Sequence, residues 1–125
     1  MKLDSEQRVL ERLGLEVELL DSGCCGMAGS FGYEQGAPYD VSIKAGERVL
    51  LPAVRAAPPS ALIVANGFSC RSQIAQGTTR KALHLSEVLR LAMRFGPSGP
   101  AATHPELAAE LPPRPPGCRR RRRLP

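Results

Sequence analysis

The sequence predicts a small α/β domain: a three-layer parallel sheet of about three strands with flanking helices, followed by a disordered C-terminal tail. Short apolar runs alternate with segments of helical periodicity over residues 1–95, and this alternation is typical of a parallel sheet with right-handed crossovers. From Gly96 onward the composition changes to proline and arginine, which cannot bury a core. The chain therefore divides into a domain at residues 1–95 and a tail at residues 96–125.

The first predicted element is a helix from Asp4 to Leu13, where apolar side chains recur at helical spacing. Gly14 ends it, in a position that glycine favours after a helix. The next six residues, Leu15 to Leu20, alternate apolar and acidic side chains before becoming wholly apolar, which predicts a strand with one half-exposed face. This strand delivers the chain into a glycine-rich loop.

A second helical pattern begins at Asp40, with apolar residues three and four positions apart. Pro52 interrupts it, because an interior proline lacks the N–H and clashes one turn back, at a cost of about 3 kcal/mol. We expect a kink there, or two short helices end to end.

The remaining elements repeat a strand, loop and helix order. The runs ALIVA at 61–65 and KALHL at 81–85 predict two more strands, the first of them buried on both faces. Helical turns are expected over residues 71–76, and a final helix, capped by Ser86, runs through Arg94.

Charge and cysteine content exclude several classes of protein. The net charge is +5, but residues 1–95 carry 11 basic and 10 acidic side chains, so most of the excess lies in the tail, in the run Arg119 to Arg123. We therefore expect no specific nucleic-acid binding. Four cysteines are too few for a disulfide-rich secreted scaffold, and Met1 to Asp4 do not begin a signal peptide, which predicts a cytoplasmic setting. No apolar run reaches the roughly 20 residues of a transmembrane helix.

The chemistry is expected in the stretch Asp21 to Tyr33, DSGCCGMAGSFGY. Cys24 and Cys25 follow the first predicted strand and Cys70 follows the second, and the carboxyl ends of parallel strands meet at one edge of a sheet. Adjacent cysteines seldom bond to each other. Thiolates are the preferred ligands of iron–sulfur clusters and zinc, so the three cysteines are candidate metal ligands.

Glycines shape the same loop. Gly23 and Gly26 flank the cysteine pair, and they are candidate cofactor-binding residues because backbone without a side chain can approach an inorganic core and offer N–H groups to it.

Three alternatives remain open at this stage. Buried free cysteines are commonly small hydrophobic residues. Glycines 26, 29 and 32 loosely imitate a dinucleotide fingerprint, although the spacing is G-x-x-G-x-x-G and no lysine follows. Cys24 or Cys25 is a candidate nucleophile with His84 as its base. Cys118, in the tail, is expected to be an exposed thiol.

Three separated motifs resemble a known family. GCCGMAGSFGYE at 23–34, GERVLLPAVRAAP at 46–58 and NGFSCRSQIAQGTTRKALHLSEVL at 66–89 are similar to the last cysteine-rich CCG domain of FAD-linked oxidases fused to an iron–sulfur region, of the glycolate oxidase or D-lactate dehydrogenase type. Related CCG domains occur in the glycolate oxidase iron–sulfur subunit and in heterodisulfide reductase. The resemblance covers about residues 5–94.

The resemblance implies an electron-transfer module in which Cys24, Cys25 and Cys70 ligate an iron–sulfur cluster, of the 4Fe–4S type. Its implied partners are a flavin oxidase domain or subunit and an electron acceptor, with FAD bound only in that flavin part. Gly67 stands where the family often has a cysteine. A further family cysteine and the flavin domain lie upstream of these motifs.

The resemblance therefore predicts that this chain is a fragment, truncated on its N-terminal side, that is not catalytic alone. The competing hypotheses are a structural zinc or thiolate-binding domain and a fragment without function.

Overall fold

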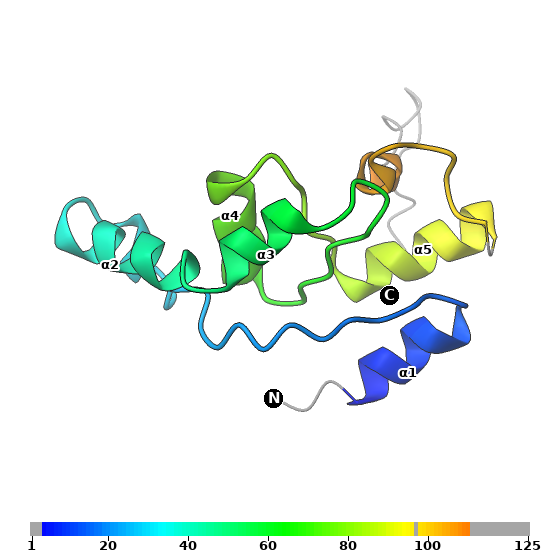
Figure 1. The fold of residues 1–125 in the computed structure, drawn as a ribbon, viewed down its shortest axis with the longest axis horizontal. Coiled ribbons are helices and arrows are strands. Elements are labelled where there is room, and N and C mark those ends of the chain that lie inside the picture. Colours follow the sequence, from blue (N-terminus) through cyan, green and yellow to red (C-terminus); the bar gives the residue numbers. More distant parts are fainter. Residues whose placement is uncertain (1–3, 97, 111–125) are drawn as a thin grey trace, which may run out of the picture.

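The structure is a computed structural model that describes residues 4–96 and 98–110. Its elements are α1 (Asp4–Arg12), η1 (Phe31–Tyr33), α2 (Ala37–Gly46), α3 (Leu50–Ala56), α4 (Phe68–Gly77), α5 (Leu85–Phe95) and η2 (Pro105–Ala109), of which η1 and η2 are 3₁₀ helices. Figure 1 shows the helices strung along an elongated body, with α2 at one end and α1, α5 and η2 at the other. The described part of the chain is thus helical.

The predicted parallel sheet is wrong, because the described residues contain no regular strand. What remains of it is one parallel bridge between Val64 and Leu83. Two backbone hydrogen bonds flank this bridge, from Ala65 N to Leu83 O at 2.9 Å and from Leu83 N to Ile63 O at 2.8 Å. The second and third predicted strands therefore do meet in parallel, over a single residue pair.

Helix boundaries explain why the pairing stops there. α4 begins at Phe68, directly after the turn that follows the second predicted strand, and α5 begins at Leu85, inside the third. A ladder needs several residues of extended backbone on both sides, and here the helices take them.

The first predicted strand fails for another reason. Residues 15–20 are extended in Figure 1 and run back from α1 past α5. Within the described residues, however, no backbone hydrogen bond joins residues 16–20 to another segment. Leu19 and Leu20 are 52% and 43% exposed, so the apolar end of this run lies at the surface rather than in a core.

The helix predictions are closer to the structure. The helix expected at 4–13 is α1, and the interrupted helix after residue 40 is the pair α2 and α3. The break falls at residues 47–49, so Pro52 lies in the first turn of α3, where its missing N–H leaves no hydrogen bond unmade. The expected two short helices end to end are confirmed, with the break three residues earlier than the proline.

The core consists of two clusters on either side of the bridged segments. One contains Cys25, Met27, Leu50, Val54, Ile74 and Ala82. The other contains Leu10, Leu83, Val88, Leu91 and Ala109. Neighbouring residues 82 and 83 face opposite clusters, as the alternation of an extended chain requires. The cysteine loop thus belongs to the first cluster, and α1, α5 and η2 enclose the second.

The expectation of a wholly disordered tail is also wrong for the part that the structure describes. η2 packs against α5, with Pro105, Glu106 and Ala109 buried. Glu106 accepts a hydrogen bond from Arg80 Nε at 2.6 Å, and the side chains of this ion pair are only 3% and 6% exposed. Residues 111–125, which include Cys118 and the arginine run, lie outside the described residues.

Within the described ranges, no helix has the length and apolar character needed to cross a membrane. The expectation from hydropathy is confirmed to that extent.

Candidate thiol site

The cysteine loop takes a backbone course that glycine makes accessible. Gly23 and Gly26, on either side of the cysteine pair, have φ of +64° and +93°, in the region that side chains disfavour. Around Gly23 there is open space. A Cβ on Gly26 would overlap the carbonyl oxygen of Ser42 in α2, so the loop lies directly against that helix.

Sequence-adjacent Cys24 and Cys25 lie in different surroundings. Cys25 is buried in the first core cluster at 9% exposure, and Cys24 is exposed. The backbone N–H of Gly26 donates to Cys24 Sγ at 3.3 Å, which is the kind of N–H to sulfur bond that stabilises a thiolate ligand. The loop therefore presents one thiol to the interior and one to solvent.

Cys70 comes from the first turn of α4 and packs against the cluster that contains Cys25. Burial, a hydrogen bond with the Cys25 thiol, and the charges of Cys25 and Cys24 together raise the pKa of Cys70 to about 11. The cysteine pair thus acts electrostatically on a thiol that is distant in sequence. The helical fold brings Cys25 and Cys70 together without a sheet edge, and leaves Cys24 exposed.

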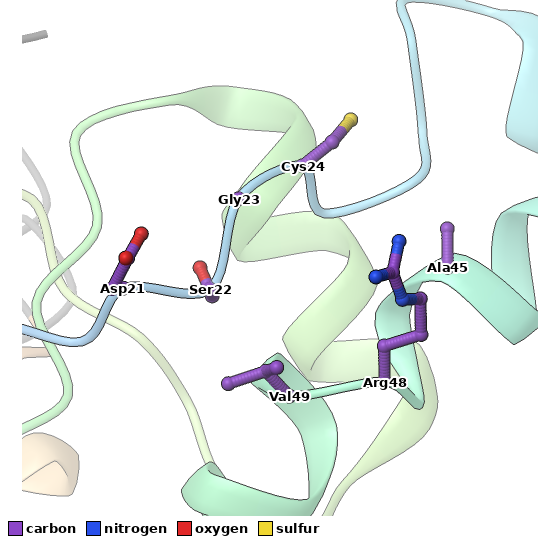
Figure 2. A pocket seen from close by; sticks show the side chains of 7 residues that line it. All are labelled: Asp21, Ser22, Gly23, Cys24, Ala45, Arg48 and Val49. Atoms are coloured by element: carbon purple, nitrogen blue, oxygen red, sulfur yellow. The ribbon is translucent and has the colours of Figure 1, made fainter.

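A pocket of about 270 Å³ lies between the cysteine loop and the C-terminal end of α2. Figure 2 shows residues 21–24 of the loop on one side of it, and Ala45, Arg48 and Val49 on the other. Arg48 is the basic side chain of this lining and Asp21 the acidic one. The Cys24 side chain points away from Arg48 and Val49 in Figure 2, so the pocket lies against the backbone side of the loop.

The donor atoms suit an iron–sulfur cluster or zinc, since three thiols and a sulfur-directed N–H are what such groups bind. Their placement is less complete. Among residues 4–96 and 98–110, no group of three or more Cys, His, Asp or Glu side chains is arranged to hold a metal ion. Binding by all three thiols would require the exposed Cys24 side chain to turn toward the other two.

The remaining candidates have structural duties. His84 caps α5: its Nδ1 accepts from Ser86 N at 3.1 Å, and its own N–H donates to Glu87 Oε2 at 2.8 Å. The cap is therefore His84, two residues before the serine that the sequence predicted. Gly26 and Gly32 lack side chains where a Cβ would strike Ser42 or Met27, which accounts for two of the three glycines of the apparent dinucleotide fingerprint.

The sequence-based prediction of the site did not include two buried residues that lie under the cysteine loop. Ser42 and Gln73 are 0% and 1% exposed, and a hydrogen bond from Gln73 Nε2 to Ser42 O at 3.1 Å joins them. The available signal was spacing, because Gln73 lies three residues after Cys70 and so on the same side of a helix.

Fold and site together define a small helical domain in which Cys25 and Cys70 lie in contact and Cys24 is exposed on the same loop. Comparison with known proteins adds a relationship to oxidoreductases. The chain is 34% identical over 89 residues to a D-2-hydroxyglutarate dehydrogenase of Pseudomonas putida, and 38% identical over 69 residues to one of Pantoea ananatis. These alignments cover 70% and 54% of this chain.

The same alignments cover only 8% and 6% of the two dehydrogenases, so the chain spans less than a tenth of the length of these relatives. No family model and no solved structure matches it. The comparisons support the predicted relationship to an oxidoreductase of the hydroxy-acid dehydrogenase type. The assignment to the CCG domain stays a prediction.

Proposed function

We propose that this chain is a cysteine-rich CCG module that holds an iron–sulfur cluster through Cys24, Cys25 and Cys70. The observation that carries the proposal is the contact of Cys25 with Cys70, which pack in one cluster and whose thiols are hydrogen-bonded, on the same loop as the exposed Cys24. A raised thiol pKa means that the surroundings of the thiol stabilise its thiolate form poorly, and a bound metal cation would offset the cost of forming that thiolate. Similarity to D-2-hydroxyglutarate dehydrogenases supports a redox role in preference to a purely structural one.

When bound, the cluster would accept and release single electrons, between a flavin that oxidises a 2-hydroxy acid and a further acceptor. The chain's own residues perform the binding. The Gly26 N–H stabilises the sulfur of Cys24, and the burial of Cys25 keeps water from one side of the site. Arg48 lines the same pocket as Cys24 and would bring positive charge to the neighbourhood of an anionic cluster.

Three thiols leave one position of a four-thiolate cluster to another group. Such a group would approach at Cys24, because Cys24 is exposed whereas Cys25 is buried and Cys70 is partly covered by the core. The partner in this proposal is the flavin-containing part of a dehydrogenase, which also determines the substrate.

Anaerobic reconstitution of the purified chain with iron and sulfide tests the proposal. The visible spectrum and the iron, sulfide and zinc content per chain are measured for the wild type and for Cys24→Ala and Cys70→Ala. We expect a brown protein that loses its colour in both variants, with Cys118→Ala as the matched control that keeps it. A colourless protein with stoichiometric zinc would refute the cluster and support the zinc-site alternative, and a protein that takes up no metal would support the fragment without function.

A further inference from the structure

A buried polar contact lies directly beneath the cysteine loop. Gln73 on α4 donates from Nε2 to the backbone oxygen of Ser42 on α2 at 3.1 Å, and approaches Ser42 Oγ at 3.4 Å. Ser42 is 0% exposed and Gln73 is 1% exposed. Polar side chains of this kind are rarely buried without a specific partner to hold.

On its other side, Ser42 supports the loop itself. Its carbonyl oxygen occupies the space where a side chain on Gly26 would begin. Its hydroxyl lies 3.6 Å from the sulfur of Met27, and 2.5 Å from where a Cβ of Gly32 would stand. Ser42 therefore touches the loop just after the cysteine pair and again at the loop's far end.

Gln73 and the backbone of Cys25 both lie against Gly46. A Cβ placed on Gly46 would lie 3.0 Å from Gln73 Nε2 and 3.3 Å from the carbonyl oxygen of Cys25, so this glycine lets both groups pack close to it. Because Gln73 follows Cys70 by three residues on α4, the two side chains lie on the same side of that helix.

The amide of Gln73 is only half used. Its Oε1 is buried and has no hydrogen-bond partner among the described residues. A methionine or leucine would fill the space without leaving an acceptor unpaired. The feature that glutamine adds is therefore the N–H donor to Ser42.

We propose that Gln73 and Ser42 are positioning residues for the thiol site: their buried hydrogen bond sets the placement of the Cys24–Cys25 loop relative to Cys70. This inference rests on the proposed function in one respect, that the three thiols bind a metal together. Neither residue touches the metal, and both act through the backbone that carries the cysteines.

Cobalt binding tests the proposal in Gln73→Met, which keeps the size of the side chain and removes the donor. Co²⁺ is titrated anaerobically, and thiolate-to-cobalt charge-transfer absorption reports the number of thiolates bound. We expect the Co²⁺ affinity to fall by about 10-fold or more, as for other residues that orient metal ligands, and the charge-transfer band to weaken. The matched control is Gln76→Met, on the exposed face of the same helix, which should leave both unchanged.

A second measurement needs no metal. Dibromobimane joins two neighbouring thiols, and peptide mass spectrometry identifies which. Wild type and Gln76→Met should form a crosslink between Cys70 and the Cys24–Cys25 pair, and Gln73→Met should lose it while keeping the wild-type circular dichroism spectrum. If the wild type crosslinks but binds neither cobalt nor a cluster, the proposed function fails and the positioning role stands.

Gly46→Ala provides a second route if Gln73→Met does not fold. Its methyl group would press against Gln73 Nε2, and more lightly against the Cys25 carbonyl oxygen and Leu51 Cδ1, without removing any polar atom, and the same losses of affinity and of crosslink are expected. Wild-type cobalt affinity and crosslinking in a folded Gln73→Met or Gly46→Ala variant would overturn the proposal.

Discussion

Replacing Gly26 with alanine should destabilise the domain far more than the same change at Gly29. Both glycines have a positive φ, of +93° and +71°, so each alanine carries the cost of left-handed backbone, about 1–2 kcal/mol. Only at Gly26 does the new methyl group meet packed atoms. There it would overlap the carbonyl oxygen of Ser42 and lie 3.0 Å from Ala45 Cβ, whereas nothing lies within 4 Å of a Cβ on Gly29.

Overpacking of this kind costs about 1–3 kcal/mol, because backbone must shift to relieve it. We therefore expect Gly26→Ala to lose about 2–5 kcal/mol and Gly29→Ala about 1–2 kcal/mol. The effect of alanine on the unfolded chain is the same in both variants and cancels in the difference. Against a total stability of about 5–15 kcal/mol for a domain, the Gly26 loss is large.

Urea unfolding followed by circular dichroism measures both variants on the metal-free chain, with a shared slope to confirm that the unfolded states are comparable. Equal shifts of the unfolding midpoint in the two variants would refute the reasoning, because they would mean that the contact between the loop and Ser42 contributes nothing.

Two further predictions concern the other end of the molecule. Burial alone would raise the pKa of Glu106, but the hydrogen bonds and charge of Arg80 outweigh it and hold that pKa below 4.5. The stability that this carboxylate contributes is therefore complete above pH 4.5, and it is lost as the pH falls through the lower pKa of the folded state. Glu106→Gln should lower the free energy of unfolding by about 3 kcal/mol at neutral pH, because it leaves Arg80 buried without its counter-charge, and it should weaken the dependence of the urea midpoint on acid pH. The control is the exposed Glu110→Gln, which should do neither. A loss of equal size in that control would contradict the assignment. His84→Ala should lower the stability by about 1 kcal/mol, because α5 loses its N-terminal cap, and thermal unfolding measures this change. An unchanged unfolding midpoint would show that the hydrogen bond from Ser86 N–H to His84 Nδ1 is not stabilising.

Local signals in the sequence determined the helices. Apolar spacing located α1, the pair α2 and α3, and α5 to within a few residues, because helix formation depends on side chains three and four positions apart. Sheet formation depends on partners distant in sequence, and the apolar runs at 61–65 and 81–85 did find each other. The pairing of these two segments stops after one residue pair because α4 and α5 begin directly beside it, and neither apolar run by itself shows where those helices begin.

The same division holds for the site. The sequence by itself singled out Cys24, Cys25 and Cys70, because paired cysteines among glycines are unusual and a third followed an equivalent turn. Only the tertiary structure showed that one thiol is exposed and another buried, and that Ser42 and Gln73 lie beneath them. From sequence alone, a serine and a glutamine are expected at the surface. Their burial allows the hydrogen bond between them to support the loop, and that burial is decided by the packing of α2, α4 and the loop together.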